Sequence, residues 1–491
     1  MSDFISRSQE AVAAGATHSL ESGAGYQAQF ERSLGKFESF AVAFSFISIT
    51  TGLFSTYGSV LVSSGPIGIW TWPIVTLGTL LVALVFGLLA SKIPLSGFSY
   101  QWASRLVNPV VGWWFGWASF AFTMMVAVAV DYGLAQVALF PLLGLDYTPQ
   151  AGALTAAVVF LIQGALIIWS TPLLTRINNM AVAAEVIAVI GLIVGIGVAV
   201  SFFGKGNLSN LFSTGIVHSD HYYGWLGPFM LSGLLGAFTL VGWEAAANMA
   251  EETHNPKQVV PRAMANAVLI SGVMGTFFLI VISMGLGDQV AELTKSSAPV
   301  ADVIRVTLGE TMSKLILVVV CVAIFACGLV IMTSNSRLVH SMARDGRLPF
   351  SEQLSRVPRA TGGPSWATVF VTLVSVLVVL SFYNSPDALT EMLGAATLFP
   401  ALLYSGTVIL YIATRHKHVH HADDFTLGKW EWPVVIGACV WLAVELCVFI
   451  IPSDFRVAQM YVLASMAVGA VIFAIVWMTR RRQLERMPPL H

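Results

Sequence analysis

Twelve long apolar stretches are the feature that most restricts how this sequence can fold. They lie near residues 38–62, 67–90, 109–140, 151–170, 177–203, 224–249, 262–286, 313–342, 366–383, 388–414, 432–451 and 457–479. A helix needs roughly 20 mainly apolar residues to cross about 30 Å of hydrocarbon. Only 10% of the 491 residues are charged, whereas soluble domains average about 25%. Because a spanning segment must satisfy its backbone groups internally, the sequence predicts an all-α integral membrane protein with twelve transmembrane helices.

The basic residues predict the orientation of these helices. An even number of spans puts both termini on one side, and a cytoplasmic placement puts 20 of the 25 Lys and Arg residues in the cytoplasm, where such residues concentrate. We therefore expect a multi-pass plasma (inner) membrane protein with a flexible cytoplasmic tail (1–36), one transmembrane domain (37–480) and a second cytoplasmic tail (481–491). The net charge of −1 argues against a nucleic-acid partner, and no obligate protein partner is expected.

Two of the apolar stretches contain residues that weaken a helix near its centre. The first contains Ser48-Ile49-Thr50-Thr51-Gly52 and the sixth contains Gly236 through Gly242. Glycines and β-branched residues disfavour a helix, and broken backbone at membrane depth is tolerated where it faces protein or a cavity. Small residues also permit close helix packing, which is the alternative interpretation. Two breaks five helices apart favour an inverted repeat, about 37–203 and about 224–414, with peripheral helices at about 432–479 and a solute bound between the breaks.

Three motifs carry a resemblance to a known family. Residues 242–256 read Gly-Trp-Glu-Ala-Ala-Ala-Asn-Met-Ala-Glu-Glu-Thr-His-Asn-Pro and are followed by Pro261-Arg262. Residues 342–349 read Met-Ala-Arg-Asp-Gly-Arg-Leu-Pro, and residues 425–430 read Phe-Thr-Leu-Gly-Lys-Trp. The pattern resembles the amino acid–polyamine–organocation superfamily, and the third motif favours its amino acid/choline subfamily. The resemblance covers roughly residues 36–479.

The resemblance implies five-plus-five inverted repeats, two extra helices and alternating access to a central site. In that site Phe238 matches an aromatic residue that caps the substrate, and Glu244 matches the family's acid just past the second break. The family usually has a Gly-Ser-Gly stretch in helix 1, whereas Thr50-Thr51-Gly52 stands here. Fewer glycines leave less room for backbone amides to close on a carboxylate. The expected substrate-binding residues are Ile49, Thr50, Thr51, Gly52, Phe238, Thr239, Gly242 and Asp131.

Charged residues within the apolar stretches need a reason, because each costs about 2.5–3.5 kcal/mol at the bilayer centre. Glu185 on helix 5 lies at a depth similar to that of Thr333 and Ser334 on helix 8. A carboxylate and two hydroxyls at one level form a candidate proton or sodium site. Glu244 is a candidate gate or proton carrier, and Asp131 could attract an ammonium group. The alternative for each acid is a hydrogen-bonded structural carboxylate or, for Asp131, an interfacial acid wetted from outside.

These observations predict a secondary active transporter rather than an enzyme. It would import an amino acid or small organic amine, of the γ-aminobutyrate, choline, ethanolamine or polyamine class, by proton-coupled alternating access. The alternatives are an exchanger, a sodium-coupled symporter and, in another class, a nutrient sensor that binds without transport. We expect no catalytic residues, no bound metal and no cofactor besides a coupling ion, H+ or Na+. The histidine-rich run at 415–421 is interpreted as a solvated loop. The expected partners are the small-molecule substrate and the lipid bilayer.

Overall fold

The computed structural model of the chain describes residues 32–169, 171–358, 363–385, 387–417 and 423–485. Within these ranges the regular secondary structure is helical, and one isolated bridge joins Leu34 to Thr253. The predicted tails fall mostly outside the described residues, at 1–31 and 486–491, as does much of the histidine-rich run, at 418–422. The predicted all-α fold is confirmed for the part of the chain that is described.

The helices of the first half begin with a pair separated by a single residue. They are α2 (Lys36–Ile47), α3 (Ile49–Ser63), α4 (Thr71–Lys92), α5 (Phe98–Leu106), α6 (Pro109–Gly133), α7 (Phe140–Leu143), α8 (Pro149–Trp169) and α9 (Thr171–Phe203). A π-helical turn at Leu134–Leu139 joins α6 to α7, and a 3-10 turn at Pro66–Trp70 precedes α4.

The helices of the second half begin with three short pieces. They are α10 (Pro228–Leu231), α11 (Leu234–Thr239), α12 (Ala245–Asn248), α13 (Pro256–Gly285), α14 (Val290–Leu293), α15 (Pro299–Leu308), α16 (Glu310–Arg344), α17 (Ser351–Leu354), α18 (Ser365–Ser381), α19 (Ala388–Thr414), α20 (Glu431–Ile450) and α21 (Arg456–Leu484).

Ten helical segments in the described residues are long and apolar enough to cross a membrane. They coincide with ten of the twelve predicted stretches. The other two, near 224–249 and 366–383, contain shorter apolar helices at Pro228–Thr239 and Ser365–Ser381. The first of these is short because the chain leaves helical geometry after Thr239, and Ser232 and Gly233 separate α10 from α11 within it.

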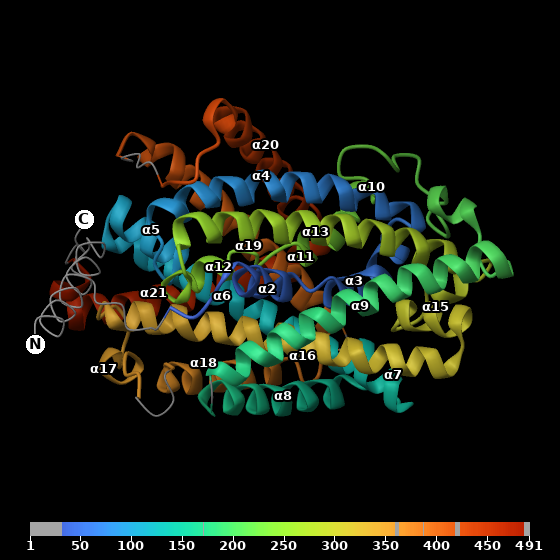
Figure 1. Cartoon of the computed structure of the whole chain (residues 1–491), viewed down its shortest axis with the longest axis horizontal. Coiled ribbons are helices and arrows are strands. Elements are labelled where there is room, and N and C mark those ends of the chain that lie inside the picture. Colours follow the sequence, from blue (N-terminus) through green and yellow to red (C-terminus); the bar gives the residue numbers. More distant parts are fainter. Residues whose placement is uncertain (1–31, 170, 359–362, 386, 418–422, 486–491) are drawn as a thin grey trace, which may run out of the picture.

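The long helices run roughly along one axis and enclose the broken ones. Figure 1 shows α5 and α17 near one end of this axis and α10 and α15 near the other. α4 packs along α13, α6 packs against α16 and α19, and α9 packs against α13 and α16. Every residue of α11 and α12 is buried, as is the stretch of α3 from Ile49 to Tyr57. The broken segments therefore occupy the interior of the bundle.

The outer helices expose their apolar side chains. Met460, Leu463 and Met478 of α21 are among the most exposed large hydrophobic residues, and α9 likewise exposes Met180 and Ile187. Such apolar faces are unfavourable in water but stable against lipid, where the hydrocarbon covers them. The exposed faces agree with a multi-pass membrane protein.

Candidate functional site

The first helix break is held by the carboxylate of Glu185 on α9. One carboxylate oxygen accepts hydrogen bonds from the hydroxyls of Ser48 and Thr50, both at 2.9 Å, and from the backbone N–H of Thr50 at 3.0 Å. Glu185 is only 2% exposed. The first N–H groups of a helix have no hydrogen-bond partner within that helix. Glu185 on α9 supplies an acceptor for one of these N–H groups at the N-terminus of α3.

The break itself is narrower than the sequence predicted. Ile49, Thr50, Thr51 and Gly52 belong to the first turn of α3, and only Ser48 leaves helical geometry, with φ 36° and ψ 94°. A non-glycine residue with positive φ is strained. The Ser48 hydroxyl compensates by accepting a bond from the Thr51 N–H. The predicted residues thus contribute first-turn amides of α3 rather than a stretch of unwound backbone.

The two breaks lie against each other because two glycines lack side chains. A Cβ atom on Gly52 would lie 2.1 Å from the Thr239 hydroxyl oxygen, and one on Gly242 would lie 1.7 Å from the Phe46 ring. Gly242 also has φ +83°, which other residues rarely adopt. The second break runs from 240 to 244, somewhat later than the predicted 236–242. Thr239 and Gly242 therefore lie where the two broken helices contact each other. Phe238 is buried one residue earlier.

Glu244 is tied to the second break by a tyrosine from α19. The Tyr404 hydroxyl donates to the Glu244 carboxylate at 2.8 Å and accepts from the Gly242 N–H at 3.2 Å. The rings of Phe86 and Trp243 pack around Tyr404, with centroids 5.2 Å from its ring in both cases. Tyr404 thus bonds to the residues on both sides of Trp243 and fixes the path of the unwound backbone.

Asp131 lies in a different environment from the one the sequence suggested for an interfacial acid. It is fully buried on α6, and one carboxylate oxygen accepts a 3.0 Å bond from the Gln163 amide on α8. The same amide also donates to the Phe325 carbonyl on α16 at 3.2 Å. Among the described residues its hydrogen bonds lead to α8 and not to either break.

Thr333 and Ser334 do not share a hydrogen bond with Glu185 in the described residues. The Thr333 hydroxyl donates to the Leu329 carbonyl in its own helix, and the Ser334 hydroxyl accepts from the Asn248 amide at 2.7 Å. Each hydroxyl is therefore hydrogen-bonded to a partner other than Glu185. Ser334 links α16 to α12, directly after the second break.

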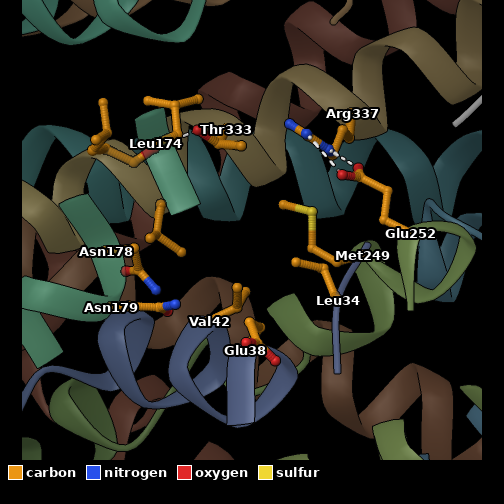
Figure 2. A pocket seen from close by; sticks show the side chains of 12 residues that line it. Leu34, Glu38, Val42, Leu174, Asn178, Asn179, Met249, Glu252, Thr333 and Arg337 are labelled. Carbon is orange, nitrogen blue, oxygen red and sulfur yellow. Dashed lines mark hydrogen bonds and ion pairs between the residues drawn. The ribbon is translucent and has the colours of Figure 1, made fainter. Parts of the chain in front are cut away.

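A cavity of about 50 Å³ lies next to these residues, and Figure 2 shows the side chains around it. Thr333 lines it from α16, Asn178 and Asn179 line it from α9, and Glu38 and Val42 line it from α2. Asn178 precedes Glu185 by seven residues, about 10 Å along a helix. The cavity therefore lies between the first break and the end of the bundle that carries the basic residues.

Two buried ion pairs close that end of the bundle. Arg337 of α16 binds Glu252, with the two side chains 3% and 6% exposed, and Arg344 binds Glu251 at 3.1 Å. Glu251 also accepts from the Ser96 N–H. Both pairs join α16 to the short turn at Ala250–Glu252 that follows the second break. Asp345 accepts a hydrogen bond from the Tyr100 hydroxyl.

Sequence reasoning missed four residues that shape the site: Ser48 as the strained turn, Tyr404, Asn248 and Gln163. Tyr404, Asn248 and Gln163 are single polar residues within apolar segments, and only their partners on other helices give them a role. Ser48 carried a signal, because serine is a good N-cap for a helix that begins at the next residue, Ile49.

Comparison with known proteins adds independent information. The family profile described as "Amino acid permease" matches residues 34–476. "Amino-acid permease BAT1" of Arabidopsis thaliana is 27% identical over 461 residues, which cover 88% of each chain. Its homolog in Oryza sativa subsp. japonica is 27% identical and covers 89% of this chain and 88% of its own. The "GABA-specific permease" of Saccharomyces cerevisiae is 22% identical and covers 87% of this chain and 76% of its own.

The contact between the breaks gives a first testable prediction. We expect Gly52→Ala to abolish solute binding and uptake, because its new methyl group would overlap Thr239 and force the two breaks apart. Gly191→Ala on α9 is the matched control, since a Cβ there meets nothing within 4 Å. Uptake into liposomes and solute binding should be measured for both variants. Normal function of Gly52→Ala would show that the close contact is unnecessary.

The ion pair beneath the cavity gives a second prediction. Arg337→Met should lower the midpoint of thermal unfolding, because removing one partner of a buried pair costs about 3–5 kcal/mol. Arg481→Met removes a pair with Glu485 whose side chains are 62% and 48% exposed, and should change the midpoint little. Both are measured by thermal unfolding in detergent. Equal midpoints for the two variants would contradict the stabilising role of the Arg337–Glu252 pair.

Proposed function

The chain belongs to the amino acid permease family, and we propose that it imports an amino acid or small organic amine by proton-coupled alternating access. Its relatives are named as permeases, not enzymes, so transport and not catalysis is the starting point. The proposal concerns the substrate class, the coupling ion and the mechanism.

The observation that carries the proposal is the pair of broken helices in mutual contact. A helix that stops in mid-membrane exposes N–H and C=O groups that have no partner in lipid, so the break needs polar atoms around it. Here Gly52 lies against Thr239 and Gly242 lies against Phe46. Glu185 and Tyr404 supply hydrogen bonds at the two breaks. Broken half-helices of this kind hold solutes and coupling ions in secondary transporters.

The proposed architecture is a twelve-span bundle with two inverted repeats of five helices. In it α10, α11 and α12 together form the sixth span, and α18 forms the ninth. The 17 residues of α18 extend about 25 Å at 1.5 Å per residue, close to the hydrocarbon thickness. The breaks in spans one and six then occupy equivalent places, and α20 and α21 lie outside the repeats. Both termini are proposed to be cytoplasmic.

The substrate proposal rests on the charges near the breaks and on the relatives. The acidic residues Glu185, Glu244 and Asp131 are buried in the described spans, which favours a cationic or zwitterionic solute over an anion. A relative is named a GABA-specific permease, which is consistent with an amino acid or an amine. Substrate access to the cytoplasm would run past the cavity at Thr333 and require the Arg337–Glu252 pair to open.

Glu185 is the proposed proton carrier. It is buried, it contacts the strained turn at Ser48, and no Lys or Arg in the described residues forms an ion pair with it. A carboxylate without a cation inside a membrane is costly, so proton uptake is favoured whenever its hydrogen bonds to α3 are broken. Coupling then follows, because α2 and α3 can only rearrange at Ser48 when the charge on Glu185 changes.

The test is uptake into liposomes with an inward proton gradient or a sodium gradient. The labelled panel contains neutral amino acids, γ-aminobutyrate, choline, ethanolamine and putrescine. We expect one solute class to enter with protons, and we expect Glu185→Gln to reduce proton-driven uptake at least tenfold while solute binding persists. The side chain keeps its size, but it no longer changes charge.

Glu445→Gln is the matched control, because Glu445 is also a buried carboxylate but lies on α20. Loss of uptake in both variants would indicate a general effect of buried acids. Uptake that needs solute preloaded inside, without dependence on either gradient, would identify an exchanger. Uptake that follows only the sodium gradient would identify a sodium symporter. Binding without uptake would identify a sensor.

A further inference from the structure

A large groove between α2 and α13 is separate from the helix breaks. Its volume is about 1050 Å³, and its walls come from the start of α2, the first half of α13 and the loop residue Asp423. Four basic residues line it: Arg32, Lys36, Lys257 and Arg262. They belong to the end of the bundle that the proposed orientation places in the cytoplasm.

The basic end of the groove has an excess of positive charge. Within the described residues, no acidic side chain forms an ion pair with Arg32, Lys36 or Arg262. Lys257 lies 3.6 Å from Asp424, which also binds Lys92 at 3.5 Å. The Asp423 carboxylate, also at the groove, offsets only part of this charge. The four basic side chains of the groove outnumber Asp423 and Asp424, and Asp424 is shared with Lys92, so the site attracts an anion.

The backbone at the basic end adds to this attraction. α13 is a helix of 30 residues, and it begins at Pro256 beside the groove. Its N-cap Asn255 makes no side-chain capping hydrogen bond. The N-terminus of a long helix carries a partial positive charge and favours phosphate groups. This second source of positive potential points at the same place as the four basic side chains.

The groove also has apolar walls. Phe40 lies one turn after Lys36 and Ile270 lies two turns after Arg262, and Val259 and Ala263 line the groove as well. The polar Asn266 lies between Arg262 and Ile270. Ile270 lies 13 residues after Lys257, about 20 Å along the helix. Ile270 is 41% exposed, beside the exposed Leu269 and Val273 on the same apolar face. A soluble anion would use only the basic end, whereas an amphiphile fits both ends.

From this gradient we infer that the groove between α2 and α13 binds an anionic phospholipid of the cytoplasmic leaflet. The phosphate headgroup lies among Lys36, Lys257 and Arg262, and an acyl chain follows Phe40 and Ile270. Basic pockets between helices at the cytoplasmic surface are suited to such headgroups. The lipid joins Lys36 on α2 to Arg262 on α13. A bound lipid therefore holds α2, the half-helix that precedes the Ser48 turn. The assignment to the cytoplasmic leaflet rests on the proposed orientation, and an effect on transport rests on the proposed transport cycle.

The experiment measures lipid binding directly, without transport. The full-length protein in neutral detergent is titrated with phosphatidylglycerol or phosphatidylcholine and examined by native mass spectrometry. We expect the double variant Lys36→Gln/Arg262→Gln to bind phosphatidylglycerol roughly thirty-fold more weakly, which corresponds to about 2 kcal/mol for two basic contacts. Phosphatidylcholine should bind weakly to both proteins.

The matched control is Arg356→Gln/Lys429→Gln, which removes two exposed cations outside the groove. It should bind phosphatidylglycerol as the unaltered protein does. An equal loss in both double variants, or a loss in neither, would overturn the inference. Competition by millimolar inorganic phosphate that removes all phosphatidylglycerol binding would also overturn it, because the site would then recognise a free anion. The unfolding midpoint of each variant checks folding, and Arg262→Gln alone replaces the double variant if needed.

Proposed transport and lipid binding fail in distinguishable ways. If lipid binding behaves as expected but no solute in the panel is taken up, the lipid inference is supported and the transport proposal is contradicted. If uptake is normal but the Lys36→Gln/Arg262→Gln variant binds phosphatidylglycerol as tightly as the unaltered protein does, only the lipid inference is contradicted.

Discussion

The hydrogen bonds between Glu185 and the N-terminus of α3 are the interaction on which the site depends. A helix that restarts in mid-membrane presents amide groups that lipid cannot satisfy. Ser48 supplies one partner from within the chain, and Glu185 supplies a charged partner from α9. Bonds to a charged group are stronger than neutral ones, at about 1.5–3 kcal/mol each. The strained turn is therefore stable only while α9 stays in place, which links the position of α9 to the shape of the first break.

Much of the fold was predictable because lipid leaves few choices. Apolar stretches such as 313–342 can only be buried helices in lipid, and α16 spans that region. The breaks were also predictable in outline, since Gly52 and Gly242 mark places where another segment approaches too closely for a side chain.

The rest depends on contacts between helices, which a single sequence does not reveal. Glu185, Thr333 and Ser334 lie at similar depth, but depth does not fix the direction in which a side chain points around its helix. In the fold Glu185 faces Ser48, while Ser334 faces Asn248. Tyr404 and Gln163 are single polar residues in apolar segments, and each gains its role from a carboxylate on another helix. The sequence likewise does not show which residues form a break, because the turn at Ser48 is stabilised by Glu185 on another helix.

The position of Glu185 also restricts how a solute can be recognised under the proposed function. The Thr50 N–H would be a natural ligand for a substrate carboxylate, but it already donates to Glu185. A second carboxylate at this place would be repelled by the first, since like charges in a low-dielectric site interact strongly. Two solutions remain: Glu185 is protonated when an amino acid binds, or the substrate presents an ammonium group to Glu185. In both cases the charge on Glu185 and the identity of the substrate are determined together, so the coupling ion and the specificity share one residue.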